Sequence, residues 1–127
     1  MLDLIIKNGS CYIDKDLKDQ DIAIKDGKII KIGKIDSEAK ETFDAEGLTV
    51  LPGCIDTQTH FREPGSTDTE DLHSGSRAAI VGGITSVFEM PNTNPPTSTK
   101  VEFQKKLDLA KNSMYCNYAF YFGATAD

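Results

Sequence analysis

The sequence predicts an α/β protein in which a small β-rich unit precedes the first strands and helices of a (β/α)8 barrel. Residues 1–52 contain short apolar stretches separated by turn residues, without a helical pattern. Residues 53–127 alternate apolar stretches with amphipathic ones, as βαβ units do. Only three strands are expected in this second region, whereas a closed barrel has eight. We therefore expect an incomplete barrel, from a truncated chain.

The first unit is predicted to be a small antiparallel β unit over residues 1–52. Its strands are expected at 2–7, 10–13, 20–25 and 28–33, and a last apolar stretch lies at 48–53. The pair Asn8-Gly9 lies between the first two of these strands, and Asp26-Gly27 lies between the last two. The pair Glu46-Gly47 precedes the last apolar stretch. Asn-Gly and Asp-Gly pairs favour hairpins because both central residues of the tight turn need positive φ.

The second unit is expected to alternate strands and helices from residue 53 to residue 127. Its strands are predicted at 53–57, 84–90 and 114–122. A first helix is predicted to begin at Thr67, which forms a capping box with Glu70, and to end at Gly82-Gly83. A second helix is predicted to begin at Thr99, which forms a capping box with Glu102. This order indicates a parallel sheet.

The composition excludes several classes of partner. Hydrophobic residues make up 39% and charged residues 27% of the chain, a balance typical of globular proteins. No apolar stretch is long enough to span a membrane, and the N-terminus does not resemble a secretory signal. The net charge of -6, without a basic cluster, disfavours nucleic acid and anionic membranes. Three widely spaced cysteines predict no disulfide framework, which indicates a cytoplasmic location.

Polar loops follow the first two predicted parallel strands, at residues 55–65 and 89–96. Catalytic groups of (β/α)8 barrels lie at the carboxyl ends of the strands. The candidates are His60, a possible metal ligand, together with Arg62 and Asn92, which suit a carboxylate or an amide of a substrate. Loops also need polar residues, Gly and Pro for structural reasons alone, and a lone histidine is more often structural. Two such loops at adjacent strand ends favour a functional site.

Two stretches resemble a known family. The string PGCIDTQTHFREPG, residues 52–65, resembles the PG-x-ID-x-H-x-H pattern of the amidohydrolase superfamily in its dihydroorotase form. The string GGITSVFEMPNTNP, residues 82–95, resembles the second dihydroorotase pattern. The β-rich opening is similar to the small β-sandwich domain that precedes the barrel in these enzymes. The presence of Arg62 favours a dihydroorotase over an allantoinase or a hydantoinase.

The resemblance implies reversible cyclisation of N-carbamoyl-L-aspartate to L-dihydroorotate, in pyrimidine biosynthesis, at a site with one or two zinc ions. It implies that His60 is a metal ligand and that Arg62 and Asn92 bind the substrate carboxylate. A carboxylated lysine, two further histidines and the Asp that acts as general base are expected beyond residue 127. No catalytic residue is therefore expected within the chain, which we expect to be inactive alone. A homo-oligomer is also expected.

One position departs from the pattern, because Gln58 replaces the first histidine of HxH. A neutral amide oxygen suits zinc less well than imidazole, so Gln58 is expected to be a weak metal ligand. This departure leaves open a second interpretation, a non-catalytic dihydroorotase-like partner of aspartate transcarbamoylase. The retained Arg62 and Asn92 favour the enzyme, since a scaffold does not need to bind carbamoyl aspartate.

Overall fold

The computed structural model describes residues 1–126. The chain divides into two compact units, Met1–Pro52 and Gly53–Asp127. No helix in the described part of the chain is long and apolar enough to cross a lipid bilayer.

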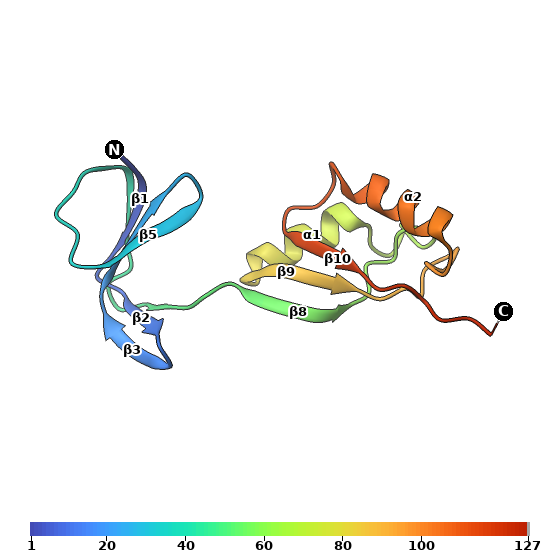
Figure 1. The fold of residues 1–127 in the computed structure, drawn as a ribbon, viewed down its shortest axis with the longest axis horizontal. Coiled ribbons are helices and arrows are strands. Elements are labelled where there is room, and N and C mark those ends of the chain that lie inside the picture. The colour runs from blue at the N-terminus through green and yellow to red at the C-terminus, as the bar shows by residue number, and fades with distance from the viewer. Residues whose placement is uncertain (127) are drawn as a thin grey trace. The chain divides into compact units, whose positions relative to one another are not determined.

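The first unit contains two small sheets (Figure 1). The four-stranded sheet has the order β5-β4-β1-β6, and the three-stranded sheet has the order β3-β2-β7. Ile5 and Ala23, which belong to the larger sheet, form a buried cluster with Ile35. The strands are β1 (Leu2–Lys7), β2 (Ser10–Ile13), β3 (Asp16–Asp19), β4 (Asp21–Lys25), β5 (Lys28–Gly33), β6 (Ala39–Asp44) and β7 (Thr49–Val50).

The prediction of a purely antiparallel unit was wrong. Strand β1 pairs antiparallel with β4 but parallel with β6, and β2 pairs antiparallel with β3 but parallel with β7. The parallel pairs join strands that are distant in the sequence, which a search for local turns does not detect. Both sheets are therefore mixed.

The predicted turns had different outcomes. The Asp26-Gly27 hairpin is confirmed, since both residues have positive φ and join antiparallel β4 and β5. The Asn8-Gly9 hairpin is wrong, because β1 and β2 belong to different sheets. Asn8 does have a φ of 62°, but the turn directs the chain from one sheet into the other. A hairpin that we did not predict joins β2 and β3 through Asp14 and Lys15, with φ values of 54° and 67°.

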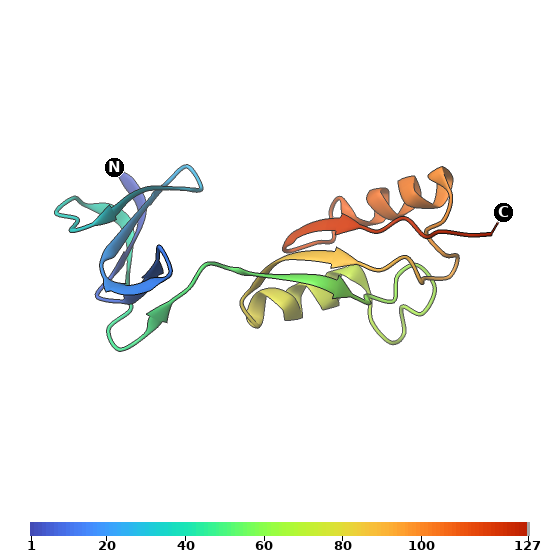
Figure 2. The ribbon, with the colours of Figure 1, turned by 60° about the horizontal axis from the view of Figure 1, so that its bottom comes forward.

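The second unit is a three-stranded parallel sheet with two helices. The sheet order is β10-β9-β8, and all pairs are parallel. One core cluster contains Leu72 of α1, Ala110 of α2 and Val87 of β9, so both helices pack on the same face of the sheet (Figures 1 and 2). The elements are β8 (Cys54–Thr59), α1 (Leu72–Val81), β9 (Ile84–Glu89), α2 (Lys100–Ala110) and β10 (Asn117–Phe120).

The opposite face of this sheet is uncovered within the described residues. Ile55 is 61% exposed and Phe88 is 37% exposed. A shallow hollow of about 220 Å³ includes both side chains and that of Tyr118. Apolar side chains on both faces are typical of parallel strands that are covered on both sides.

The helix boundaries correct one prediction. Helix α1 begins after Asp71, whose Oδ1 accepts a hydrogen bond from the Ser74 backbone N at 2.6 Å. The Thr67–Glu70 capping box is therefore wrong, and both residues lie in the loop before the helix. The start of α2 is confirmed, because Thr99 Oγ1 accepts a hydrogen bond from the Glu102 backbone N at 3.2 Å.

Candidate functional site

Two loops meet at the carboxyl ends of β8 and β9. The strands are parallel neighbours, so residues 60–71 and 90–99 leave the sheet at the same edge. The Met90 backbone N donates to Thr59 O at 2.9 Å, and the Asn94 backbone N donates to Pro64 O at 2.9 Å. A Cβ atom on Gly65, whose φ is 121°, would lie 2.8 Å from the Cβ atom of Asn94. The two loops therefore form one closely packed structure.

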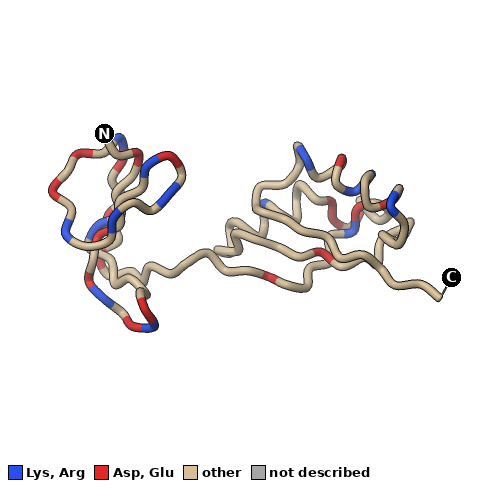
Figure 3. Tube along the Cα trace, viewed as in Figure 1, with Lys and Arg blue, Asp and Glu red and all other residues tan. Residues whose placement is uncertain are grey.

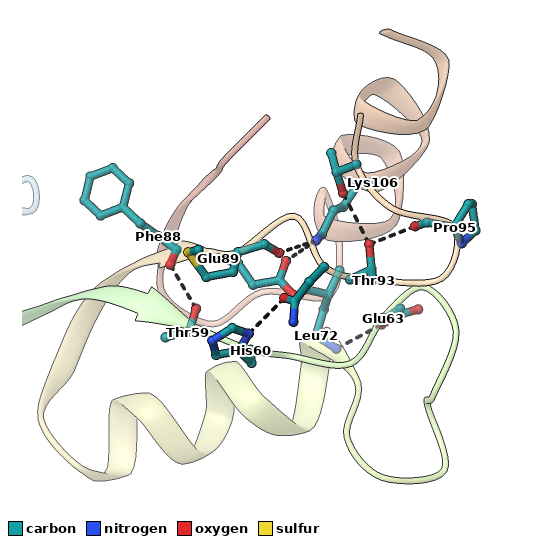
Figure 4. A network of polar contacts seen from close by, with 12 residues as sticks. Thr59, His60, Glu63, Leu72, Phe88, Glu89, Thr93, Pro95 and Lys106 are labelled. Atoms are coloured by element: carbon teal, nitrogen blue, oxygen red, sulfur yellow. Dashed lines mark hydrogen bonds and ion pairs between the residues drawn. The ribbon is translucent and has the colours of Figure 1, made fainter. Parts of the chain in front are cut away.

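His60 and Asn92 lie together across these loops. His60 Nδ1 and Asn92 Oδ1 are 2.9 Å apart (Figure 4). A carboxamide oxygen only accepts hydrogen bonds, so Nδ1 carries the proton in this pair. The Nε2 atom then keeps its lone pair, which is the form of imidazole that binds a metal ion. Asn92 still has its amide Nδ2 as a donor.

Gln58 and Arg62 have exposed side chains. Gln58 donates its backbone N to Asp56 Oδ1 at 2.9 Å, and its side chain makes no hydrogen bond with His60 within residues 1–126. Arg62 forms no ion pair in the same range, so its guanidinium is available to an external anion. Of the four predicted site residues, the structure brings His60 and Asn92 into direct contact.

Phe61 fixes the backbone between His60 and Arg62. Its ring is buried in the core cluster that contains Leu72. A Cβ atom on Gly75 of α1 would lie 2.5 Å from Phe61 Cδ1, so only glycine leaves room for the ring. Next to it, Glu63 Oε2 accepts a hydrogen bond from the Leu72 backbone N at 2.9 Å, at the beginning of α1. The loop after β8 is thus attached to α1 by packing and by a hydrogen bond.

Sequence reasoning missed a buried ion pair near this edge of the sheet. Asp56 and Glu89 are the only charged residues in the three strands β8, β9 and β10 (Figure 3). Glu89 is fully buried and pairs with Lys106 of α2, which is also fully buried (Figure 4). Burial raises the pKa of Glu89 to about 7, although Lys106 opposes this shift. The available signal was a lysine at apolar spacing, between Phe103 and Ala110.

The described residues do not by themselves make a zinc site. Within residues 1–126, no group of three or more His, Cys, Asp or Glu side chains is placed to hold a metal ion. The second histidine, His73, lies on α1, and its Nε2 is 3.1 Å from Tyr115 Oη. One imidazole and a neighbouring amide fall short of the three protein ligands of a catalytic zinc ion. His60 fits the role of one ligand among several.

Comparisons with known proteins relate this geometry to one family. Residues 49–126 match the model of the Amidohydrolase family. Allantoinase from Escherichia coli O1:K1 / APEC is 45% identical over 113 residues, which cover 88% of this chain and 25% of that protein. This relative is named allantoinase and two similar solved structures are named hydantoinase, so none of these three carries the name dihydroorotase.

Solved structures agree with this relationship. L-hydantoinase from Arthrobacter aurescens superposes with a TM-score of 0.90 at 35% identity, over 99% of this chain and 29% of that one. D-hydantoinase from Thermus sp. superposes with a TM-score of 0.79 at 29% identity, over 95% of this chain and 27% of that one. The chain thus spans about a quarter of the length of the relatives it matches.

Proposed function

The chain belongs to the amidohydrolase family, and from this premise we propose that the protein containing it is a cyclic amidohydrolase that acts on dihydroorotate. Water adds to the ring amide carbonyl, the C–N bond breaks, and the released nitrogen takes a proton. The reverse reaction closes N-carbamoyl-L-aspartate. The observation that carries this proposal is the His60–Asn92 pair at 2.9 Å, together with an exposed Arg62 that forms no ion pair within residues 1–126.

Each residue of the site has a proposed role. His60, with Nε2 unprotonated, is a ligand of a zinc ion whose other ligands lie outside the described residues. Gln58 takes the place of a second imidazole and is the weaker ligand. A zinc ion bound there would polarise the amide carbonyl that is attacked.

Arg62 determines the substrate in this proposal. Dihydroorotate carries a carboxylate on the carbon next to the ring nitrogen that is not cleaved, and carbamoyl aspartate keeps the same α-carboxylate, whereas hydantoin and allantoin have no carboxylate there. A guanidinium can bind that carboxylate through two parallel hydrogen bonds. The Nδ2 atom of Asn92 is a further donor, since only Oδ1 is used by His60.

Two other functions have specific support. Hydrolysis of allantoin or of a hydantoin is favoured by the names of the similar proteins, one of them 45% identical. A non-catalytic role, as a structural partner of aspartate transcarbamoylase, is favoured by Gln58, which weakens the metal site. Hydrolysis of allantoin or of a hydantoin does not require Arg62, and a non-catalytic role does not require a loaded metal site. The dihydroorotase proposal requires both.

The test is an assay of the complete protein, loaded with zinc, against a panel of substrates. Dihydroorotate, carbamoyl aspartate, allantoin and hydantoin are supplied separately, and kcat/KM is measured for each. We expect dihydroorotate and carbamoyl aspartate to be the preferred pair. A preference for allantoin or hydantoin would replace the proposal by the second function, and no turnover of any of the four would support the third.

A further inference from the structure

Lys106 is a lysine without access to solvent. Its ammonium group pairs with the buried Glu89 carboxylate and lies 5.0 Å from the centroid of the Phe120 ring. It also donates to the backbone O of Met90 at 3.4 Å. Apart from the ion pair, neither oxygen of Glu89 has a hydrogen-bond partner among the described residues.

Stability alone does not account for these two charges. Desolvation of both groups offsets most of their attraction, and a well-packed apolar pair of similar size often stabilises a core equally well. An apolar pair, however, cannot donate a directed hydrogen bond. The Lys106 ammonium is held by Glu89 and points a donor at Met90, the first residue after β9.

The segment that receives this hydrogen bond ends at the site. Met90 is followed by Pro91 and then by Asn92, whose Oδ1 is 2.9 Å from His60 Nδ1. The Met90 backbone N donates to Thr59 O, so its amide is held by β8 while its carbonyl is held by α2. Figure 4 shows Lys106, Glu89 and His60 in one network of polar contacts.

We propose that Lys106 and Glu89 are positioning residues, whose buried ion pair holds segment 90–92 so that Asn92 fixes the imidazole of His60 with its proton on Nδ1. The inference rests on the proposed function for the meaning of the site. The position and the tautomer of His60 are nevertheless measurable without any activity. Lys106 acts through Met90 and Asn92 and does not touch a substrate.

The test is nitrogen NMR of the imidazoles in the 127-residue chain. The chain has only two histidines, so labelling histidine with ¹⁵N gives two rings, and a His73→Gln variant assigns them. Spectra are recorded with a chelator at about pH 9, more than two units above the ordinary imidazole pKa of about 6.5. We expect His60 to carry its proton on Nδ1. An Asn92→Ala variant provides the reference for a His60 ring that has lost its acceptor.

The decisive variant is Lys106→Met, whose unbranched apolar side chain is one atom shorter than that of lysine and has no donor. We expect the ¹⁵N shifts of His60 to move most of the way to those of Asn92→Ala. The matched control is Lys105→Met on the same helix, because Lys105 is exposed and pairs with Glu102 at 2.9 Å on the surface. The control should leave His60 unchanged. An unchanged His60 in Lys106→Met would overturn the inference.

A second variant keeps the test informative if Lys106→Met does not fold, because that substitution would leave Glu89 unpaired in the core. In Glu89→Leu/Lys106→Met both charges are removed together, so the core stays neutral. We expect this double variant to fold and to show the His60 shifts of Asn92→Ala. A folded double variant with the His60 shifts of the unmodified chain would show that packing alone positions Asn92.

The two proposals fail in different ways. If Lys106 controls the tautomer of His60 but the complete protein does not turn over dihydroorotate, positioning stands and the proposed function fails. If dihydroorotate is turned over while His60 is indifferent to Lys106, the function stands and this inference fails.

Discussion

The ring of Phe61 packs directly on Gly75, where a Cβ atom would lie 2.5 Å from Phe61 Cδ1. This contact joins α1 to the residue between His60 and Arg62. The site therefore depends on a glycine fourteen positions further along the chain, in a helix whose interior would otherwise favour alanine.

Gly75→Ala is expected to destabilise the chain by about 1–3 kcal/mol, because the added methyl group overpacks a buried contact. Chemical denaturation measures the free energy of unfolding. Gly82→Ala is the control, since its Cβ atom would meet the nearest atom at 3.5 Å and its φ is -82°. Equal stability of the unmodified chain and Gly75→Ala would show that Phe61 can move away freely.

The stability of the chain should depend on pH through Glu89. Burial raises the pKa of this carboxyl from 4.5 to about 7 in the folded state. Between these values the folded state binds more protons than the unfolded state, so stability falls as pH rises from about 4.5 to 7 and then stays level. Each pKa unit corresponds to about 1.4 kcal/mol.

The pH dependence is measured by urea unfolding at several pH values. Glu89→Gln resembles the protonated carboxyl and should lose most of the decrease between about pH 4.5 and 7. Glu102→Gln on the surface of α2 should keep it. A decrease of the same size in Glu89→Gln would assign the pH dependence to other groups.

Asp71, rather than Thr67, is expected to be the cap of α1. Asp71→Ala removes the acceptor of the Ser74 backbone N and should lower Tm by several degrees. Thr67→Ala should leave Tm unchanged, because Thr67 lies in the loop and is exposed. Thermal unfolding followed by circular dichroism compares the two variants. If Thr67→Ala lowered Tm and Asp71→Ala did not, Thr67 would be the cap of α1, as the sequence predicts.

Local signals in the sequence predicted the local structure well. Asp26-Gly27 and Thr99 act within a few residues, and their turn and cap are confirmed. Asn8-Gly9 has the same type of local signal, but the partners of β1 are β4 and β6, which turn chemistry does not specify. The Thr67 error has a different cause, because Asp71 is an equally good cap four residues further along the chain.

The site residues that could be predicted from the sequence are those that directly follow the ends of strands. His60 and Asn92 were placed at adjacent strand ends, and the structure joins them. The Glu89–Lys106 pair could not be predicted in this way, because its members lie on different elements and meet only after α2 packs on the sheet. A charged residue inside an apolar pattern is the only sign that such a pair leaves.

Gln58→His should strengthen zinc binding by the complete protein. An imidazole is a better zinc ligand than an amide oxygen, so we expect the dissociation constant to fall on the order of tenfold or more. Titration with zinc against a competing chelator gives this constant. Gln104→His, on the surface of α2, is the control for a histidine added elsewhere. An unchanged constant in Gln58→His would show that residue 58 does not contact the metal.

Selection by Arg62 of a substrate with a carboxylate is measured by kcat/KM for dihydroorotate in Arg62→Ala. Loss of a charge-assisted pair should reduce kcat/KM of the complete protein on the order of a hundredfold, about 3 kcal/mol. Arg77→Ala, which removes an exposed arginine from α1, should stay within about threefold of the unmodified protein, under 1 kcal/mol. A value for Arg62→Ala within the same threefold range would contradict the claim, because the carboxylate would then be bound by another group.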